Sequence, residues 1–367
     1  MKERFTLRKV FRRSTAIAFS GLAVLGLAVF LVATATASTK HRTASVDVCV
    51  LLPDTKSSVR WATQDAPDFK KAFEKAGVKA SINNALNDPL KQKAQAQACL
   101  AAGAKVVIET SLDNGSAASI EKLFTSKGGK AIDYDRLVLG GTASVYVTFD
   151  GTAVGKAQAN GVIAAMKAKG TYKPTSTVAE LWGGQTDQNA FWFKSGNDAV
   201  LNPLFKAKKL KKGPTKFVPD WDANNASTIF SQMLVSTNNN IQGVIAANDN
   251  IAGAVIADLK AKHLPPVPLS GQDATAQGVQ YILAGWQSGT TFKYVPDEVN
   301  GAATAAIALL KGQKPKTTTT RKNGSRNEPT VALPITWITK ANYKILFTKK
   351  FLKKSDVCIG AYAKYCK

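Results

Sequence analysis

Several apolar runs in this sequence end in planar, polar side chains that are suited to binding a small polar ligand. Asp135 and Arg136 follow one such run, and three later runs end at Asp187, Asn248 and Asp273. A carboxylate accepts hydrogen bonds, arginine donates them, and an asparagine amide does both. Such a set matches the hydroxyl groups of a sugar, which donate and accept together, and its charged members form the stronger bonds.

The same side chains could instead cap the helices that follow them, because Asp and Asn are preferred at helix N-caps. For Asp54, Asp150 and Asp249, capping and ligand binding both stay open. Arg136 differs, because its guanidinium cannot accept a hydrogen bond from a helix N-terminus. Its expected partner is Asp135, another carboxylate of the same cleft or a ligand oxygen.

The elements that position these side chains follow a repeated pattern of strand and helix. The first series of predicted strands is 46–52, 78–82, 104–109, 130–134 and 144–149. A second series, after Val154, is 177–184, 216–221, 242–249 and 267–273, and 290–295 adds a late strand. In the first series, the amphipathic segments between strands end at glycine, as helix C-termini often do. This order predicts an α/β fold of two doubly wound parallel-sheet domains, whose strand ends face the ligand.

Residues 1–40 have the layout of an export signal. Basic residues crowd the positions before Ser14, and an uncharged apolar run follows that ends in small residues near Ala35 and Ala37. Cleavage at an A-x-A site is expected. The alternative is an uncleaved anchor helix, because the run is long enough to cross a bilayer. Both outcomes predict an exported protein, in the periplasm or on the outer face of the cytoplasmic membrane.

The chain has 367 residues and a formal net charge of +24, of which residues 1–40 supply about +6. This surplus favours anionic neighbours such as envelope polymers or lipid headgroups, and no nucleic acid partner is expected for an exported chain. Roughly 325 residues remain after the signal, more than one hydrophobic core usually serves, which again predicts two domains.

Four cysteines, Cys49, Cys99, Cys358 and Cys366, form an even number in an oxidising compartment. Cys358 and Cys366 are close enough in sequence to close a small disulfide loop near the C-terminus. Cys49 and Cys99 are either a second bridge or two buried thiols. No metal or other cofactor is expected, because the two histidines lie away from any cysteine pair.

A set of short motifs occurs in order between about Val46 and Ile335. They are VRW (59–61), YDR (134–136), FD (149–150), GGQTDQNA (183–190), W-x-x-x-NA (221–226), AND (247–249), SGQDA (270–274) and TFK (291–293). As an ordered set, they resemble the D-xylose-binding proteins of ABC import systems, a branch of the type I periplasmic sugar-binding proteins. The resemblance implies two domains, joined by three hinge segments, that close on one sugar and present it to a membrane permease.

The resemblance also assigns residues to the substrate-binding site, motif by motif. These are Arg60, Trp61, Asp135, Arg136, Asp187, Asn189, Trp221, Asn248, Asp273 and Lys293. Trp61 and Trp221 would stack on the apolar faces of the ring. The remaining tryptophans are expected in the core: Trp182, Trp192, Trp286 and Trp337. The chain has Ser58 where relatives have a charged residue and Gln188 in the middle of its DQN segment, so the preferred aldose stays open.

With the resemblance, the expected organisation has four parts. They are an export signal at 1–40, an N-terminal lobe of 44–149 plus 292–326, a C-terminal lobe of 150–291 plus 327–346, and a disulfide-bonded tail at 347–367. The protein is expected to be a monomer with a monosaccharide ligand and an ABC permease as partner. It would meet the membrane only through that permease or an uncleaved signal.

Two other functions would use the same residues. A glycoside-active enzyme would employ carboxylates such as Asp135, Asp187 and Asp273 as an acid and a base. Against it, the polar groups are spread around a ring instead of concentrated on one bond. A surface sensor that reports sugar occupancy to a membrane partner would need the same cleft. The sequence therefore predicts a binding protein and not an enzyme, with transport and sensing both open.

Overall fold

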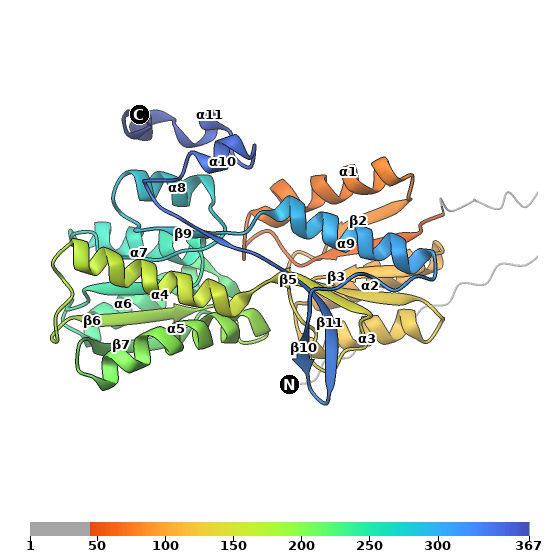
Figure 1. The fold of residues 1–367 in the computed structure, drawn as a ribbon, viewed down its shortest axis with the longest axis horizontal. Helices are drawn as coiled ribbons and strands as arrows, with labels where there is room; N and C mark the ends of the chain where they lie inside the picture. The colour runs from red at the N-terminus through yellow and green to blue at the C-terminus, as the bar shows by residue number, and fades with distance from the viewer. Residues whose placement is uncertain (1–44, 367) are drawn as a thin grey trace, which may run out of the picture. The chain divides into compact units, whose positions relative to one another are not determined.

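The computed structural model describes residues 45–366. The predicted export signal lies outside the described residues. Within them, two sheets with separate hydrophobic cores form an N-terminal and a C-terminal lobe, which confirms the predicted fold class (Figure 1). No helix in this part of the chain is long and apolar enough to cross a membrane.

The N-terminal lobe is built on a seven-stranded sheet in the order β10-β11-β5-β4-β3-β1-β2. Its strands are β1 (Val48–Leu52), β2 (Ala80–Asn84), β3 (Val106–Glu109), β4 (Lys130–Tyr134), β5 (Val145–Phe149), β10 (Thr319–Asn323) and β11 (Arg326–Leu333). Neighbours pair in parallel except for the hairpin of β10 and β11. Strands β1 and β5 are buried along their whole length, as expected for a parallel sheet covered on both faces.

Two layers of helices cover this sheet. They are η1 (Trp61–Asp65), α1 (Ala66–Ala76), α2 (Pro89–Ala101), α3 (Asn114–Thr125) and α9 (Val295–Leu310). Helices α1 and α9 pack against one another over a core that includes Phe69 and Val299. Helices α2 and α3 pack together over a second core around Ile120 and Phe124. This lobe therefore holds the loops after β1 and β4 on a rigid base.

The C-terminal lobe contains a parallel sheet in the order β7-β6-β8. Its elements are β6 (Thr177–Trp182), β7 (Lys211–Phe217), β8 (Gly243–Ala246), α4 (Gly151–Ala168), α5 (Gln188–Lys206), η2 (Pro219–Trp221), α6 (Ala223–Ser236), α7 (Asp249–Ala261) and α8 (Ala276–Leu283). The predicted strand at 267–273 forms only the isolated bridges Val244↔Leu269 and Gln272↔Thr291. Pro266 and Pro268 lack the N–H groups that a regular ladder requires.

The chain passes between the lobes at three places: after β5, between β9 (Thr290–Phe292) and α9, and between β11 and β12 (Thr336–Ile338). Strands β9 and β12 pair with each other in antiparallel fashion. The last crossing was predicted at residue 327, and this position is wrong, because β11 pairs with β5 as far as Leu333↔Phe149. The tight turn at Gly324, with φ of 60°, reverses the chain and places 327–333 in the N-terminal sheet. The other domain limits stay predictions.

The C-terminal segment, residues 343–366, contains the short helices α10 (Ile345–Thr348), α11 (Lys354–Val357) and η3 (Gly360–Tyr365). Elements α11 and η3 pack on α8. Cys358 and Cys366 are disulfide-bonded, as predicted. Cys49 and Cys99 form the second bridge, which joins β1 to α2 and decides the alternative that the sequence left open.

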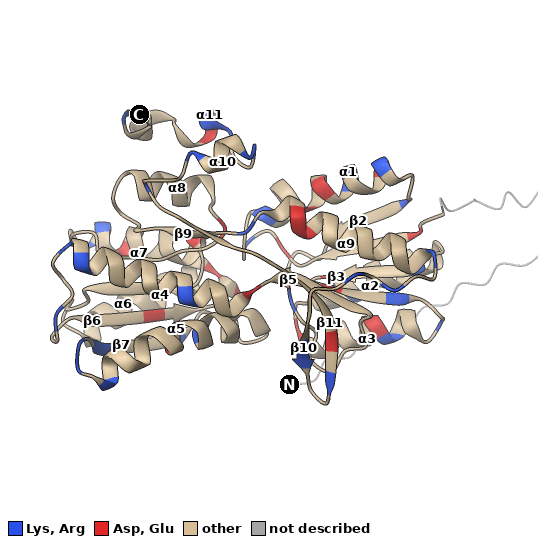
Figure 2. Cartoon of the chain, viewed as in Figure 1, with Lys and Arg blue, Asp and Glu red and all other residues tan. Residues whose placement is uncertain are grey.

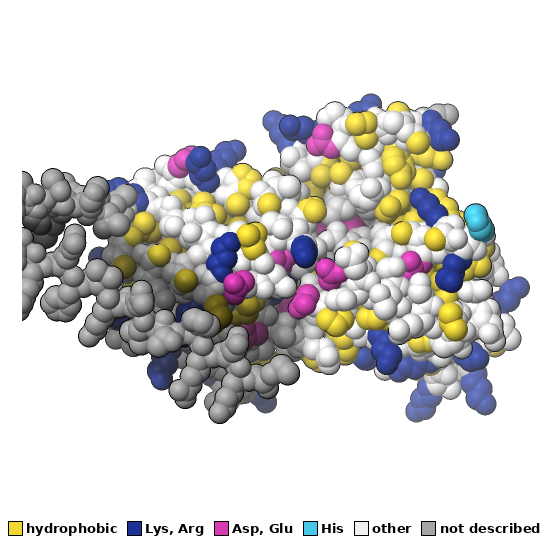
Figure 3. All heavy atoms as spheres, turned by 180° about the vertical axis from the view of Figure 1, so that it is seen from behind, with side chains coloured by type: hydrophobic (Ala, Val, Ile, Leu, Met, Phe, Trp, Pro, Cys, Tyr) yellow, Lys and Arg dark blue, Asp and Glu magenta, His cyan; other side chains and the backbone are white. Residues whose placement is uncertain are grey.

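A cluster of exposed lysines lies at the outer end of the C-terminal lobe (Figure 2). They are Lys206, Lys208, Lys209, Lys211, Lys212 and Lys216. Figure 2 shows this blue cluster around β7, and on the face in Figure 3 the basic side chains lie mostly toward the rim. Because β7 is an edge strand, charged side chains there discourage pairing with another chain.

Candidate functional site

A cavity lies where strand ends of the two lobes face each other. Every residue that the sequence assigned to the ligand site lines it: Arg60, Trp61, Asp135, Arg136, Asp187, Asn189, Trp221, Asn248, Asp273 and Lys293. The sequence did not assign the other lining residues: Ser57, Ser58, Phe193 and Gln272. Gln272 directly precedes Asp273, and Phe193 lies one helical turn after Asn189. The sequence could therefore have predicted both as lining residues from their positions relative to the assigned ones.

Most of these side chains meet because they follow the carboxyl ends of strands. Asp135 comes directly after β4, and Lys293 directly after β9. Trp221 lies in the turn after β7, and Asn248 precedes helix α7 two residues after β8. In parallel sheets these ends share one edge, so residues far apart in the chain converge there.

Asp135 is the most heavily paired carboxylate of the cavity. Its Oδ2 atom lies 3.0 Å from Nη1 of Arg60 and 3.3 Å from Nζ of Lys293, and Oδ1 accepts from Asn189 Nδ2 at 3.2 Å. The backbone at Asp135 is left-handed, with φ of 60°, a conformation that Asp tolerates better than most residues. Burial alone would raise the pKa of Asp135, but Lys293, Arg60 and Arg136 outweigh burial and hold the pKa below its ordinary value.

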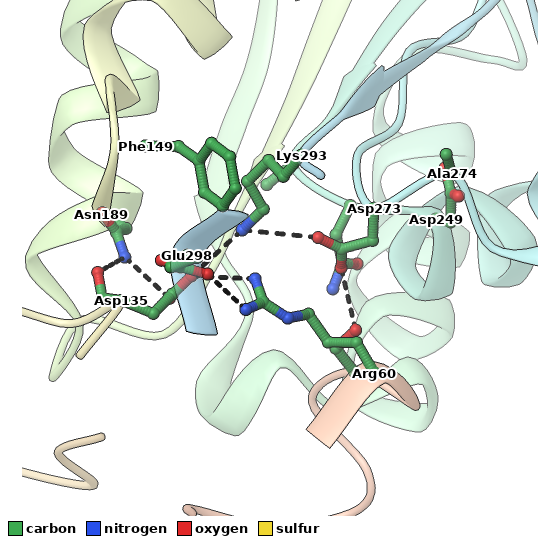
Figure 4. Close-up of polar contacts among 12 residues, drawn as sticks. Arg60, Asp135, Phe149, Asn189, Asp249, Asp273, Ala274, Lys293 and Glu298 are labelled. Carbon is green, nitrogen blue, oxygen red and sulfur yellow. Dashed lines mark hydrogen bonds and ion pairs between the residues drawn. The ribbon is translucent and has the colours of Figure 1, made fainter. Parts of the chain in front are cut away.

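Lys293 joins the carboxylates of the two lobes. Its Nζ atom lies 3.3 Å from Asp135 and 3.5 Å from Asp273 Oδ1, and Figure 4 shows the ammonium between them. Burial lowers the pKa of Lys293, but the two carboxylates outweigh burial and raise it, so the side chain is charged. A charged donor between two acceptors can serve hydroxyl groups from either side.

Arg136 pairs with a carboxylate of the other lobe. Its Nε atom lies 3.1 Å from Asp187 Oδ2, while Nη1 donates to the Ser111 carbonyl at 3.0 Å and Nη2 to Ser57 Oγ at 3.2 Å. Of the partners that the sequence left open for Arg136, the fold therefore selects a second carboxylate of the cleft, Asp187. Burial raises the pKa of Asp187, and Arg136 offsets this only in part.

Arg60 is held from several sides at once. Its Nε and Nη2 atoms donate to both oxygens of Asp65, at 2.9 and 2.7 Å, and Nη2 also contacts Glu298 Oε2 at 2.5 Å. The remaining Nη1 reaches Asp135, so Arg60 orients that carboxylate (Figure 4). Burial raises the pKa of Glu298 to about 8, with Arg60 opposing the rise and Asp135 adding to it.

The charges around the cavity are unequal in number. The buried carboxylates are Asp65, Asp135, Asp187, Asp273 and Glu298, and the buried cations are Arg60, Arg136 and Lys293. A surplus of negative charge in a buried cluster is relieved when one carboxyl carries a proton. Burial raises the pKa of Glu298 to about 8, which favours the protonated form of this carboxyl.

Two tryptophans supply the apolar part of the cavity. Trp61 donates from Nε1 to Ser57 Oγ at 3.0 Å, and the Arg60 guanidinium lies 4.5 Å from its ring centre. Trp221 meets Phe193 edge-on at 6.2 Å. Gly183 is required beneath Trp221, because a Cβ there would lie 2.0 Å from the indole. Of the tryptophans expected in the core, only Trp182 is fully buried, and the other three are half-buried.

Helix capping and cavity lining turn out to be compatible roles. Asp187 and Asn248 line the cavity and also cap α5 and α7, where they accept from the backbone N–H groups of Asn189 and Ile251. By contrast, Asp150 caps α4 and is absent from the lining.

Asp54 and Asp249 also lie outside the lining and support the residues that form it. Asp54 accepts from the backbone and hydroxyl of Ser57. Asp249 accepts from Gln287 Nε2 and Thr290 Oγ1, each at 2.8 Å. These two carboxylates therefore shape the loops around the cavity.

The lobes touch directly beside the cavity. Ser58 Oγ donates to Asp273 Oδ2 at 2.9 Å, and Asn248 Nδ2 donates to the Ser57 carbonyl at 2.9 Å. Asn250 Nδ2 donates to the Lys56 carbonyl at 2.8 Å. Between residues 45 and 366, no group of three or more His, Cys, Asp or Glu is placed to hold a metal ion.

Comparison with known proteins gives a consistent result. The family described as a periplasmic binding protein domain matches residues 48–314. The D-xylose-binding periplasmic protein of Escherichia coli (strain K12) is 31% identical over 268 residues, which cover 72% of this chain and 79% of that protein. A multiple sugar-binding periplasmic receptor of Rhizobium radiobacter is 29% identical over 359 residues, which cover 93% of this chain and 98% of that protein.

A solved structure agrees with these sequence relatives. The carbohydrate transporter solute binding protein of Chloroflexus aurantiacus, in complex with D-glucose, matches with a TM-score of 0.77 at 29% identity, covering 85% of this chain and 98% of that chain. The ordered motifs, the two parallel-sheet lobes and these matches lead to one conclusion: the chain belongs to the periplasmic binding protein family, among its type I sugar-binding members.

Proposed function

We propose that this protein is an extracytoplasmic solute-binding protein that captures a monosaccharide, with D-xylose as the first candidate, and delivers it to an ABC permease. The observation that carries the proposal is the cavity in which Lys293 joins Asp135 of one lobe to Asp273 of the other. The similarity to a D-xylose-binding periplasmic protein supports the choice of sugar.

The enclosure of the cavity favours a small ligand. Hydrogen bonds from Ser58 to Asp273 and from Asn248 to Ser57 join the lobes at its edge, so the space between them suits one small molecule. Two tryptophan side chains in the lining offer apolar faces of the kind that stack on the C–H faces of a sugar ring. A single pyranose or furanose ring suits this enclosed site better than an oligosaccharide.

The electrostatics of the cavity favour a neutral ligand. Asp135, Asp187 and Asp273 already pair with Lys293 or Arg136. These two cations of the cavity lining therefore already have carboxylate partners and do not require an acidic ligand. An anionic sugar, such as a sugar phosphate, would meet repulsion from the surplus carboxylates. Hydroxyl groups can insert into such ion pairs because they donate to the carboxylate and accept from the cation.

Closure about the hinge is the proposed mechanism, with the ligand buried between the lobes. The contacts of Ser58 with Asp273 and of Asn248 with Ser57 join the two lobes at the edge of the cavity. In the proposed cycle these bonds form as the sugar is enclosed and break on release to the permease. The protein acts as a monomer in this scheme, because both sides of the cavity come from one chain.

Calorimetric titration with D-xylose, other pentoses and hexoses tests the proposal. We expect a dissociation constant near micromolar for D-xylose, about −8 kcal/mol. For a pentose of about ten non-hydrogen atoms this is about 0.8 kcal/mol per atom, within the limit for very small ligands. Millimolar binding of every sugar would refute the assignment.

Broader sugar recognition is a second candidate, because a multiple sugar-binding receptor matches 93% of the chain. The same titrations separate the candidates: one pentose bound at least about tenfold more tightly than the rest supports the narrow role. Comparable affinities for pentoses and hexoses support the broad role. The protein is proposed not to be an enzyme, and release of the aryl group from aryl glycosides would contradict this.

A further inference from the structure

The C-terminal segment, residues 343–366, builds a hydrophobic core of its own against the hinge. Leu346 and Val357 of the segment are buried together with Leu283 of α8 and Phe292 of β9. Gln280 on α8 donates from Nε2 to the carbonyls of residues 356 and 357, at 3.2 and 3.1 Å. The disulfide between residues 358 and 366 closes the end of this segment. The segment is therefore docked on the elements that carry part of the cavity.

Side chains of the C-terminal segment pack against Phe292 and Tyr294, the residues before and after Lys293. The ring of Phe351 lies edge-on to Phe292, with 4.7 Å between the ring centres, and 6.4 Å from the ring of Tyr294. Tyr294 also donates from its hydroxyl to the carbonyl of Lys349 at 3.3 Å, and the Lys349 ammonium lies 4.7 Å from the Tyr294 ring. The backbone on each side of Lys293 is thus packed against residues 349–351.

The hydrophobic core of the C-terminal segment also extends to the residue beside Asp273. Ala274, next to Asp273, is fully buried in it. The backbone N–H of Asp273 donates to the carbonyl of Thr291 at 2.9 Å, and that of Ala274 to Thr290 Oγ1 at 3.2 Å. Asp273 and Ala274 both have positive φ, 92° and 51°, and such a backbone persists only where its surroundings hold it. Figure 4 shows Asp273 and Lys293 with this turn beside them.

We propose that Phe351 is a positioning residue of the sugar site, and that the C-terminal segment acts through β9 to fix Lys293 and Asp273 in their binding geometry. The inference rests on the proposed sugar-binding function. A buried ion pair binds a ligand well only when neighbouring packing holds it within a fraction of an ångström. Phe351 supplies that packing at β9 while lying outside the residues that line the cavity.

The test compares two truncations in the same segment. Phe351→Ala removes the contacts with Phe292 and Tyr294. Phe347→Ala removes the same side chain from the same core, where the ring meets Tyr343 at 5.7 Å, and serves as the matched control. Calorimetry with D-xylose should show affinity weakened by about tenfold for Phe351→Ala and by less than about twofold for Phe347→Ala. Phe351→Leu, which refills the space, should recover most of the loss.

A second readout needs no sugar. Amide hydrogen exchange of the full-length protein reports the N–H groups of Thr291 and Asp273, which bond to Gly271 and Thr291. Both should exchange faster in Phe351→Ala and at the wild-type rate in Phe347→Ala. Unchanged exchange in Phe351→Ala, or equal changes in both variants, would overturn the inference. If wild-type protein binds no sugar, the proposed function fails, and exchange still decides whether Phe351 positions these residues.

Discussion

Ser58 and Asp273 lie 215 positions apart in the chain, and Ser58 Oγ donates a hydrogen bond to Asp273 Oδ2 at 2.9 Å. Ser58 belongs to the loop after β1, whereas Asp273 belongs to the turn before β9. The other oxygen of Asp273 faces the Lys293 ammonium at 3.5 Å. Asp273 is therefore a junction between the lobes, and we expect its carboxylate to sense the orientation of a ligand hydroxyl.

Asp273→Ala should weaken D-xylose binding at least tenfold, because one buried hydroxyl loses its partner, at roughly 1–3 kcal/mol. The ranking among epimeric sugars should also change, since hydrogen bonds read the direction of a hydroxyl. Calorimetry on a panel of epimers measures both effects. Asp88→Ala is the control, because Asp88 caps α2 away from the cavity. Binding within twofold of wild type would mean that Asp273 does not contact the ligand.

Arg136→Ala should also weaken D-xylose binding at least tenfold, with circular dichroism unchanged. The guanidinium contacts Asp187, Ser57 and the Ser111 carbonyl in three different directions. Arg136→Lys should recover little affinity, because an ammonium cannot reproduce that planar fork. Full recovery by lysine would indicate that Arg136 contributes only its charge.

Trp221→Ala should weaken all bound sugars by a similar factor, because stacking depends on ring area more than on hydroxyl orientation. The comparison variant is Trp286→Ala, whose half-buried indole is not part of the cavity lining. Competition titrations with several pentoses and hexoses provide the measurement. A change in sugar preference with Trp221→Ala would show that this ring selects between sugars.

The contribution of Glu298 to the free energy of unfolding should fall as the pH rises. Burial raises the pKa of Glu298 from 4.5 to about 8, so between these values the folded state binds a proton that the unfolded chain has lost. The stability due to this proton is complete below pH 4.5 and is lost as the pH rises to about 8.

Glu298→Gln cannot titrate, so its stability should fall less steeply over this range, by up to about 1.4 kcal/mol per pH unit. Denaturant unfolding at about pH 5, 6.5 and 8 measures the two slopes, with Asp88→Asn at an exposed cap as control. Parallel curves for wild type and Glu298→Gln would mean that Glu298 keeps an ordinary pKa.

Sugar binding should bring the lobes together. Small-angle scattering is expected to give a smaller radius of gyration with saturating D-xylose than without sugar, because the hinge closes on the ligand. Protein without residues 1–40, the predicted export signal, is the sample of choice. An unchanged radius, with binding confirmed by calorimetry, would argue against hinge closure.

Local sequence patterns were sufficient to predict most strands and helices and the polar residues at the carboxyl ends of the strands. Strand β4 covers the predicted 130–134, and Asp135 and Arg136 follow it as expected. This succeeded although Asp133 interrupts the apolar run, because Ala131 and Ile132 closely follow the turn glycines 128 and 129, which mark the start of a short strand. The convergence of strand ends then follows from parallel topology alone.

Pairing at sheet edges was less accessible from sequence. The segment 267–273 has the composition of a strand, yet it makes only two isolated bridges. The hairpin of β10 and β11 joins the N-terminal sheet beside β5, although the predicted crossing lay at residue 327. Which edge accepts a segment depends on neighbours that are distant in the chain, and local composition does not encode them.

Only the tertiary structure decided which polar groups meet. From sequence, Arg136 had three candidate partners, and the fold selects Asp187. Arg60 was assigned to the ligand, and the fold surrounds it with Asp65 and Glu298, so that much of its charge serves to orient Asp135. Hydrogen bonds and ion pairs act over about 3 Å and depend on direction. The polar contacts therefore depend on how the two lobes place their loops. The apolar pattern that folds each lobe, by contrast, can be recognised in short stretches of the sequence.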